Sequence, residues 1–292
     1  MVTFVDDSVT AVANATYWIY DIFVNATFIF KLLVILFFIY HFIKKTQNIC
    51  NIFFYLLFIG FIIDIIAWAL DMTDRYCQHI TSLIFGKGVA ATHPACWYLY
   101  RIDVTYGQYN NTFSSCWMLL LSVNRLTAIV WSEKYDKIWS KFAFILSIIY
   151  LIIAPICVVG YSFVDYRCRF ILDNCTDTNY WITLANVTGF GNGSFAVASV
   201  LIVIVAVINF RQTTNIKNNR NSDVKLIFQA AISSTINIIH YVCYYIVEYY
   251  RAYAYANKGY KYDLGFVFID FIKFMAYPGH HFAAFLFLFV FS

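Results

Sequence analysis

The chain has 292 residues, of which 62% are apolar and 21% aromatic, and its charged side chains are only 20 Lys and Arg and 16 Asp and Glu. A soluble domain carries about 25% charged residues, so a charged fraction of 12% argues against a water-exposed enzyme and excludes a disordered or fibrous chain. The net charge of +4 is small and the Lys and Arg are scattered, which argues against a nucleic-acid-binding protein and leaves a polytopic membrane protein.

Seven stretches are long and apolar enough to cross a bilayer as helices, which requires about 20 residues each. They lack the alternation of a membrane β-barrel and leave no stretch for a soluble domain. The predicted fold is therefore all-α, a seven-transmembrane-helix bundle over residues 24–291 that follows an extracellular segment at residues 1–23. The predicted spans are 24–43, 49–70, 103–130, 142–163, 186–210, 226–248 and 264–291.

Basic residues set the expected orientation, because Lys and Arg concentrate on the cytoplasmic side of a membrane. Three acids and no base precede the first span, whereas Lys44 and Lys45 follow it. With the N-terminus outside, the three inner loops hold nine Lys and Arg in 31 residues, and the outer segments hold eight in 92. The predicted topology is therefore N-terminus outside, and the first span is expected to act as the membrane-targeting signal.

Cysteines and glycosylation sequons support the outer side independently. Cys77, Cys96, Cys168 and Cys175 fall in predicted outer loops, where disulfides persist. Four cysteines allow three pairings, and we expect Cys96 to bridge to Cys168 or Cys175. Among the sequons, those at Asn14 and Asn174 lie away from the predicted spans and are the candidate glycosylation sites.

The outer half of the third predicted span is unusually polar. Asp103, Gly107, Asn110 (or Asn111) and Ser114 recur at helical spacing and are candidate ligand contacts on one face of a water-filled cavity. The alternative is that these side chains only bond neighbouring helices, as polar groups in bundles do.

Four charged side chains lie in apolar surroundings: Lys31, Asp64, Asp270 and Lys273. An unpaired charge at the bilayer centre costs at least about 2.5 kcal/mol, so each should have a partner. Asp270 and Lys273 are three residues apart and could pair with each other, or Lys273 could reach Asp64. They are candidates for the floor of a ligand cavity or for an ion site, although charge pairs that clamp helices are the favoured interpretation.

The outer half of the sixth span is rich in tyrosine. Tyr249 and Tyr250 suit an aromatic belt at the membrane surface, whereas Tyr241 and Tyr245 are candidates for the wall of a ligand cavity. No metal-ligand spacing, phosphate-binding loop or nucleophile motif is present. We therefore predict no metal, no cofactor and no enzyme activity.

The inner end of the third span carries a longer motif. It comprises Ser122, Asn124, Arg125, Thr127 and Ala128, followed by Tyr135, Ile138 and Trp139. This pattern resembles the corresponding segment of nematode serpentine chemoreceptors, most closely the class gamma (Srg) family. The resemblance implies a G-protein-coupled chemoreceptor, sited in the plasma membrane and in the cilia of sensory neurons, that binds an odorant or pheromone type of small molecule.

The same resemblance suggests which residues contact a heterotrimeric G protein: Asn124, Arg125, Lys134, Tyr135, Lys137, Arg211, Lys217 and Arg220. In the wider receptor class the triplet at this position is Asp-Arg-Tyr, and here it is Asn124-Arg125-Leu126. Arg125 therefore lacks the usual carboxylate neighbour. Its restraint would have to come from hydrogen bonds of Asn124 or from another acid, such as Asp136.

A small transporter or ligand-gated channel is the alternative function, with the four buried charges as its pathway. The lack of internal repeats and of paired Gly/Pro-broken spans argues against it. The expected partners of the receptor are a small-molecule ligand, a heterotrimeric G protein and membrane lipid, with no nucleic acid, and a receptor dimer is compatible with this interpretation.

Overall fold

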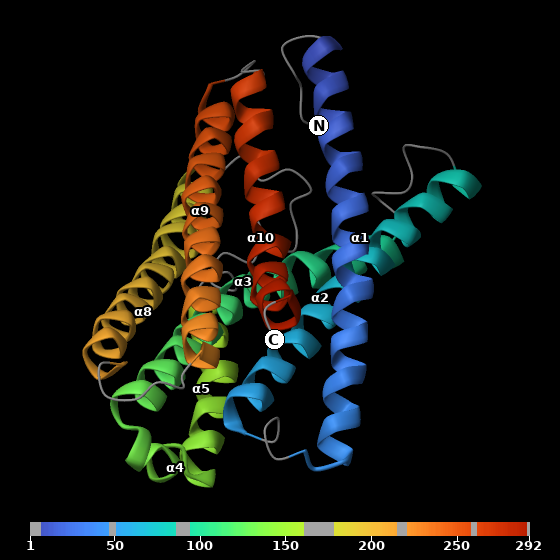
Figure 1. The fold of residues 1–292 in the computed structure, drawn as a ribbon. Coiled ribbons are helices and arrows are strands. Elements are labelled where there is room, and N and C mark those ends of the chain that lie inside the picture. The colour runs from blue at the N-terminus through green and yellow to red at the C-terminus, as the bar shows by residue number, and fades with distance from the viewer. Residues whose placement is uncertain are drawn as a thin grey trace. The chain divides into compact units, whose positions relative to one another are not determined.

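A computed structural model describes residues 7–46, 51–85, 94–160, 178–214, 221–257 and 262–290. The described residues form helices and contain no β-strand (Figure 1). The long helices are α1 (Asp7–Ile43), α2 (Ile52–Phe85), α3 (Pro94–Val130), α5 (Lys141–Val159), α8 (Asn192–Thr214), α9 (Asn221–Ala256) and α10 (Leu264–Val290). The short ones are η2 (Ser132–Lys134), α4 (Tyr135–Ile138), α7 (Thr178–Leu184) and η4 (Ala185–Gly191).

Length and composition qualify six helical stretches of the described chain as membrane spans: 7–43, 52–84, 96–130, 141–159, 179–209 and 230–254. The seventh predicted span corresponds to α10, which is one continuous helix of 27 residues. The predicted all-α membrane fold is therefore confirmed, and the chain is a multi-pass membrane protein.

Several helices run beyond the spans predicted from hydropathy. α1 begins at Asp7, so most of the segment predicted at residues 1–23 is helical. α2 continues past Leu70 to Phe85, and α3 begins at Pro94 instead of Asp103. A helix of 34 residues is roughly 50 Å long, whereas the hydrocarbon core is about 30 Å thick, so α2 is longer than one crossing requires.

Local capping explains where three of these helices begin. The Asn51 side chain accepts a hydrogen bond from the Phe54 backbone N–H at the start of α2, and the Asp263 side chain accepts one from the Phe266 N–H at the start of α10. Both arrangements satisfy an N–H group that has no partner inside the helix. Pro94 opens α3, a position where the missing N–H of proline has no cost.

The chain divides into two compact units. The first unit comprises Met1–Thr27, Ser115–Leu151 and Thr176–Ser292, and the second comprises Phe28–Ser114 and Ile152–Cys175. Within the first unit, α9 packs against both α8 and α10 (Figure 1). One apolar cluster there joins Ile129 of α3 to Val203 and Ala206 of α8.

The π-helical turn η4 brings the backbone of Gly189 close to α9. A Cβ atom added at Gly189 would lie 2.9 Å from the Tyr245 Cβ and 3.0 Å from its Cα. Carbon atoms in ordinary contact are about 3.5–4.0 Å apart, so this contact depends on the absence of a side chain. By contrast, a Cβ added at Gly107 in α3 would meet no atom within 4 Å.

These two glycines give a matched stability test. We expect Gly189→Ala to destabilise the protein by about 1–3 kcal/mol, because the new methyl group overpacks the contact with α9. Gly107→Ala is expected to stabilise it by roughly 0.5–1 kcal/mol, since alanine favours helix and has room here. Thermal unfolding of the purified variants in detergent measures both effects, and equal shifts for the two would contradict the close approach at Gly189.

Candidate functional site

The residues of the predicted signature at the end of α3 are hydrogen-bonded to the segment that follows. The Asn124 side-chain amide donates to the Tyr135 hydroxyl at 2.9 Å, and that hydroxyl lies 3.2 Å from the Asn124 side-chain oxygen. The Trp139 indole N–H donates to the Thr127 hydroxyl at 2.7 Å. Two side chains of α3 therefore hold η2 and α4 at the end of the helix, and we call these four residues the clasp.

Burial distinguishes the clasp from its surroundings. Asn124 is fully buried and Trp139 is 7% exposed, whereas Lys134 and Lys137 are exposed and Arg125 is half-buried. Burial of the phenol raises the pKa of Tyr135 above its usual value, and the hydrogen bond with Asn124 acts in the opposite direction. Tyr135 therefore stays a neutral hydroxyl at physiological pH and can keep its bond with the Asn124 amide.

The remaining predicted G-protein contacts are only partly described. Arg211 lies in α8, but its side chain is not described, and Lys217 and Arg220 lie outside the described residues. The observed hydrogen bonds of Asn124 go to Tyr135. Restraint of Arg125 by Asn124 or by Asp136 stays a prediction.

In the second unit, Asp64 of α2 connects three helices. One carboxylate oxygen forms an ion pair with the Lys31 ammonium of α1 at 2.9 Å, and the other accepts a hydrogen bond from the Asn110 amide of α3 at 3.2 Å. The Asp64 side chain is 2% exposed, so the charge has been removed from solvent and depends on these partners. The Tyr106 hydroxyl adds a second link, donating to the Ile63 carbonyl oxygen at 3.2 Å.

In the first unit, two ion pairs lie on α9 and α10. Arg251 donates to Glu248 at 2.9 Å within α9, and Lys273 contacts Asp270 within α10. His240 of α9 joins the two helices by donating to the backbone carbonyl oxygen of Lys273 at 2.9 Å. Of the two pairings considered for Lys273, the one with Asp270 is observed, and Asp64 pairs with Lys31 in the second unit.

A cavity of about 170 Å³ lies in the first unit, between the N-terminal half of α1 and the facing ends of α9 and α10. Its polar lining includes Arg251 and Asp270, and its apolar lining is mostly aromatic, with Phe271 and Phe274 from α10. Two tyrosines of α1 complete the aromatic side: the Tyr20 ring centroid lies 5.0 Å and the Tyr17 centroid 6.3 Å from that of Phe274. A mainly apolar lining with few polar groups is typical of small-molecule sites, and this cavity is small among them.

The predicted ligand contacts are divided between the two compact units. Asp103, Gly107, Asn110, Asn111 and Ser114 belong to the second unit, and Tyr241, Tyr245, Asp270 and Lys273 belong to the first. Asn110 bonds Asp64, as the helix-bonding alternative expects. Of the nine residues, Asp270 is the one that lines the cavity between α1, α9 and α10.

The two tyrosines predicted as cavity walls face other elements. Tyr245 contacts the backbone of Gly189 in η4, and the Tyr241 Cβ lies 3.5 Å from the Cβ position of Gly193 in α8. Tyr241 is 1% exposed. Their roles as ligand contacts stay predictions, whereas the tyrosines that do line the cavity are Tyr17, Tyr20 and Tyr262.

Metal binding has no support in the described part of the chain, where no three His, Cys, Asp or Glu side chains come together as a group of ligands. The predicted glycosylation site at Asn14 lies on the exposed side of α1, and Asn174 lies outside the described residues. Modification at either position stays a prediction.

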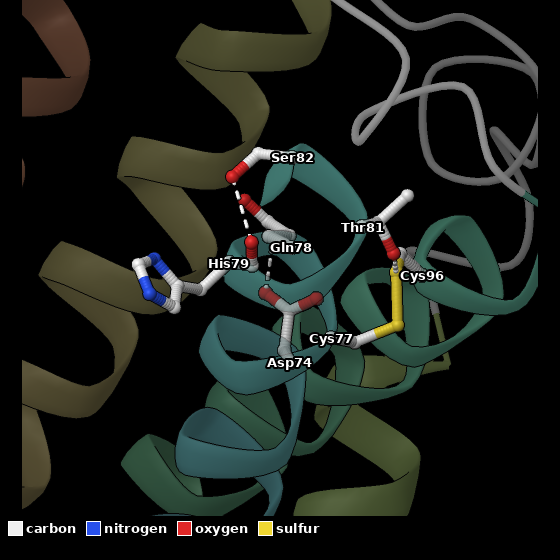
Figure 2. The surroundings of a disulfide bond; sticks show 7 residues. All are labelled: Asp74, Cys77, Gln78, His79, Thr81, Ser82 and Cys96. Carbon is white, nitrogen blue, oxygen red and sulfur yellow. Dashed lines mark hydrogen bonds between the residues drawn. A yellow bond between two sulfur atoms is a disulfide. The ribbon is translucent and has the colours of Figure 1, made fainter. Parts of the chain in front are cut away.

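The disulfide of the structure joins Cys77 of α2 to Cys96 of α3, with Cα atoms 5.5 Å apart (Figure 2). The expected pairing of Cys96 with Cys168 or Cys175 was therefore wrong. The reason lies in the helix extensions, because α2 continues to Phe85 and α3 begins at Pro94, which brings the two cysteines together across a short connection. Cys168 and Cys175 lie outside the described residues.

Polar contacts surround this disulfide on α2. The Gln78 amide donates to the buried Asp74 carboxylate at 2.8 Å, and the Thr81 hydroxyl lies 3.1 Å from the Cys96 sulfur (Figure 2). These contacts keep the polar end of α2 helical in the region of the bridge.

Removing the bridge is expected to cost roughly 3 kcal/mol of stability, as for a cross-link that closes a loop of similar length, here 19 residues apart in sequence. Cys96→Ser should therefore lower the thermal unfolding temperature and the amount of protein at the cell surface. Cys157→Ser, at an exposed free cysteine, is the matched control and should change neither. Peptide mapping without reduction checks the pairing, and a Cys96 peptide linked to Cys168 or Cys175 would contradict it.

Three features of these sites were not predicted from the sequence. The Lys31–Asp64 pair joins residues far apart in the chain, and the Glu248–Arg251 pair contains two residues that the sequence interpretation left in a loop or at a span end. The α1 side of the cavity was assigned to an extracellular segment. The sequence does indicate a helical face on this part of α1, because Ala13, Thr16, Tyr17 and Tyr20 recur at helical spacing.

Comparison with known proteins adds an independent finding. A family model described as "Srg family chemoreceptor" matches residues 17–278 of the chain. The matched region contains the whole clasp and most of the residues that line the cavity. None of the curated proteins compared with the chain matches it.

Proposed function

Because the chain belongs to the Srg family of chemoreceptors, we propose that it is a G-protein-coupled chemosensory receptor that binds an external small molecule and activates a heterotrimeric G protein. The proposed location is the plasma membrane, in the cilia of chemosensory neurons. The observation that carries the proposal is the clasp, which fixes a short charged segment at the end of α3.

The clasp supports G-protein coupling because it holds a defined surface in place. Asn124 bonds Tyr135 and Trp139 bonds Thr127, while Lys134 and Lys137 project from η2 and α4 as exposed cations. In the proposed mechanism Arg125, Lys134 and Lys137 contact the G protein. Asn124 and Tyr135 act indirectly, by positioning the segment that bears the two lysines.

The cavity between α1, α9 and α10 supports binding of an external ligand. Under the predicted orientation with the N-terminus outside, the start of α10 and the N-terminal half of α1 both belong to the outer side of the membrane. One member of each ion pair, Arg251 of α9 and Asp270 of α10, lines the cavity, and Lys273, the partner of Asp270, is the residue that His240 contacts. A ligand that binds one packing of α9 against α10 better than another would shift the receptor between two states.

The test is ligand-dependent signalling in cells that express the full chain. Volatile and pheromone panels are applied, and G-protein activation is followed by GTPγS binding or calcium release. Arg125→Ala should abolish the response while surface expression is unchanged. Arg75→Ala, which removes a partly exposed arginine from the i,i+4 pair with Asp71, is the control and should signal normally. A normal response of Arg125→Ala would contradict the role assigned to this arginine.

A further inference from the structure

The cavity between α1, α9 and α10 has a size that limits its ligand. Its volume of about 170 Å³ is close to the roughly 150 Å³ of a cavity that holds one benzene molecule. Six residues define its character: Tyr17, Tyr20, Arg251, Asp270, Phe271 and Phe274. A molecule with one six-membered ring and small substituents therefore matches the space, and a fused two-ring molecule is a tighter fit.

The charges at the cavity are already balanced within the protein. Arg251 is paired with Glu248 at 2.9 Å, and Asp270 is paired with Lys273. The Glu248 side chain is 2% exposed, and those of Asp270 and Lys273 are 8% and 6% exposed. A ligand that carried a net charge into this site would have to leave its own charge uncompensated or break one of these pairs, and both are unfavourable beside carboxylates that are nearly buried.

A neutral hydroxyl group avoids this conflict. A guanidinium has five N–H donors and a carboxylate has acceptor capacity for several hydrogen bonds, so neither Arg251 nor Asp270 is saturated by a single ion-pair contact. A hydroxyl can accept from the arginine and donate to the carboxylate without changing the charge of either pair. The aromatic side chains opposite offer offset or edge-to-face contacts to a ring.

We propose that this cavity binds a neutral single-ring alcohol, with its hydroxyl group between Arg251 and Asp270 and its ring against the aromatic side chains of α1 and α10. The inference rests on the proposed receptor function, since it names the class of external ligand that the cavity between α1, α9 and α10 would bind. It assigns a binding role to Arg251 and to the N-terminal half of α1, which the sequence interpretation did not include among the ligand contacts.

The experiment compares three probes of one shape on the purified full-length receptor in lipid nanodiscs. They are para-fluorobenzyl alcohol, para-fluorobenzoate and para-fluorobenzylammonium, and binding is followed by fluorine NMR with empty nanodiscs as the background. The alcohol should bind saturably, and the two charged probes should bind at least about tenfold more weakly. Equal or tighter binding of either charged probe would overturn the proposal.

Two pairs of variants locate the probe. Ala13→Phe fills the cavity and should weaken binding of the alcohol by about tenfold or more, whereas Ala15→Phe, on the exposed side of α1, should leave it unchanged. Phe271→Ala enlarges the cavity and should favour naphthylmethanol over benzyl alcohol, and Phe268→Ala, exposed on the same helix, should not. Probe binding that is unaltered in both Ala13→Phe and Phe271→Ala would overturn the assignment of the cavity as the binding site. If Ala13→Phe does not fold, Phe271→Ala decides alone, and parent-like selectivity of that variant would overturn the assignment.

This binding readout needs no G protein, which separates the inference from the proposed function. Signalling that responds to ligands while Phe271→Ala does not alter probe selectivity would refute the ligand site alone. If the probes bind with the expected selectivity but no G protein shows nucleotide exchange, the binding site is supported and the proposed G-protein coupling is refuted.

Discussion

Asp64→Ala is expected to remove most of the folded protein from the cell surface. The substitution leaves the Lys31 ammonium, whose side chain is 12% exposed, without its partner and takes away the acceptor of the Asn110 amide. Loss of one partner of a buried ion pair costs about 3–5 kcal/mol, which is a large part of the stability of a typical protein. Surface expression and the thermal unfolding temperature of the purified variant measure the effect.

Two controls separate the buried pair from charge loss in general. Asp71→Ala, on the same helix, breaks the partly exposed pair with Arg75 and should cost less than about 1 kcal/mol. The double variant Lys31→Met with Asp64→Leu removes both charges and should recover most of the loss, because apolar side chains can replace a buried pair. If Asp64→Ala and Asp71→Ala lose equal stability, Asp64 does not connect the three helices in the way described.

Trp139→Phe is expected to reduce G-protein activation by about tenfold while the receptor still reaches the cell surface. The substitution keeps an aromatic ring but removes the indole N–H that donates to Thr127 at 2.7 Å. A buried hydrogen bond left half-made costs about 1–3 kcal/mol, and 1.4 kcal/mol is a factor of ten in the population of the correctly held segment. Agonist-stimulated GTPγS binding, normalised to surface receptor, measures the change.

Trp131→Phe is the matched control, because Trp131 precedes the same segment and is 49% exposed. It should signal as the parent does. Thr127→Val removes the acceptor side of the same bond, so the double variant with Trp139→Phe should be little worse than either single variant. Additive losses, or an equal loss in Trp131→Phe, would show that the bond between Trp139 and Thr127 does not position the coupling segment.

The seven long helices could be predicted from the sequence because apolar length is a local property. Their true ends could not, since the polar residues after Leu70 suggested a loop. In the structure those residues satisfy one another along α2: Arg75 pairs with Asp71 at 3.0 Å and Gln78 bonds Asp74. Such i,i+4 contacts stabilise a helix that leaves the membrane, and hydropathy does not detect them.

The disulfide was mispredicted for the same reason. Four cysteines in outer loops define three pairings, and sequence order does not choose among them. The choice depends on geometry, because Cα atoms must come within about 7 Å. Only the extension of α2 and α3 toward each other brings Cys77 and Cys96 to that distance.

Of the buried ion pairs, those within one helix can be predicted from the sequence, whereas those between helices cannot. Asp270 and Lys273 are three residues apart, so their pairing follows from helical spacing alone. Lys31 and Asp64 are 33 residues apart, and their pairing depends on how α1 packs against α2. The signature of the clasp was identified in the sequence, yet its internal bonds were not, because the positions of Tyr135 and Trp139 depend on the turn after α3.

As a G-protein-coupled receptor, the chain would transmit ligand binding to a G protein and would not itself conduct ions. The most direct measurement uses the purified receptor in liposomes, with and without a purified heterotrimeric G protein, and the best ligand from the cell panels. We expect ligand-dependent nucleotide exchange on the G protein and no ligand-gated current. A ligand-gated current in liposomes that contain the receptor alone, without accelerated nucleotide exchange, would contradict it.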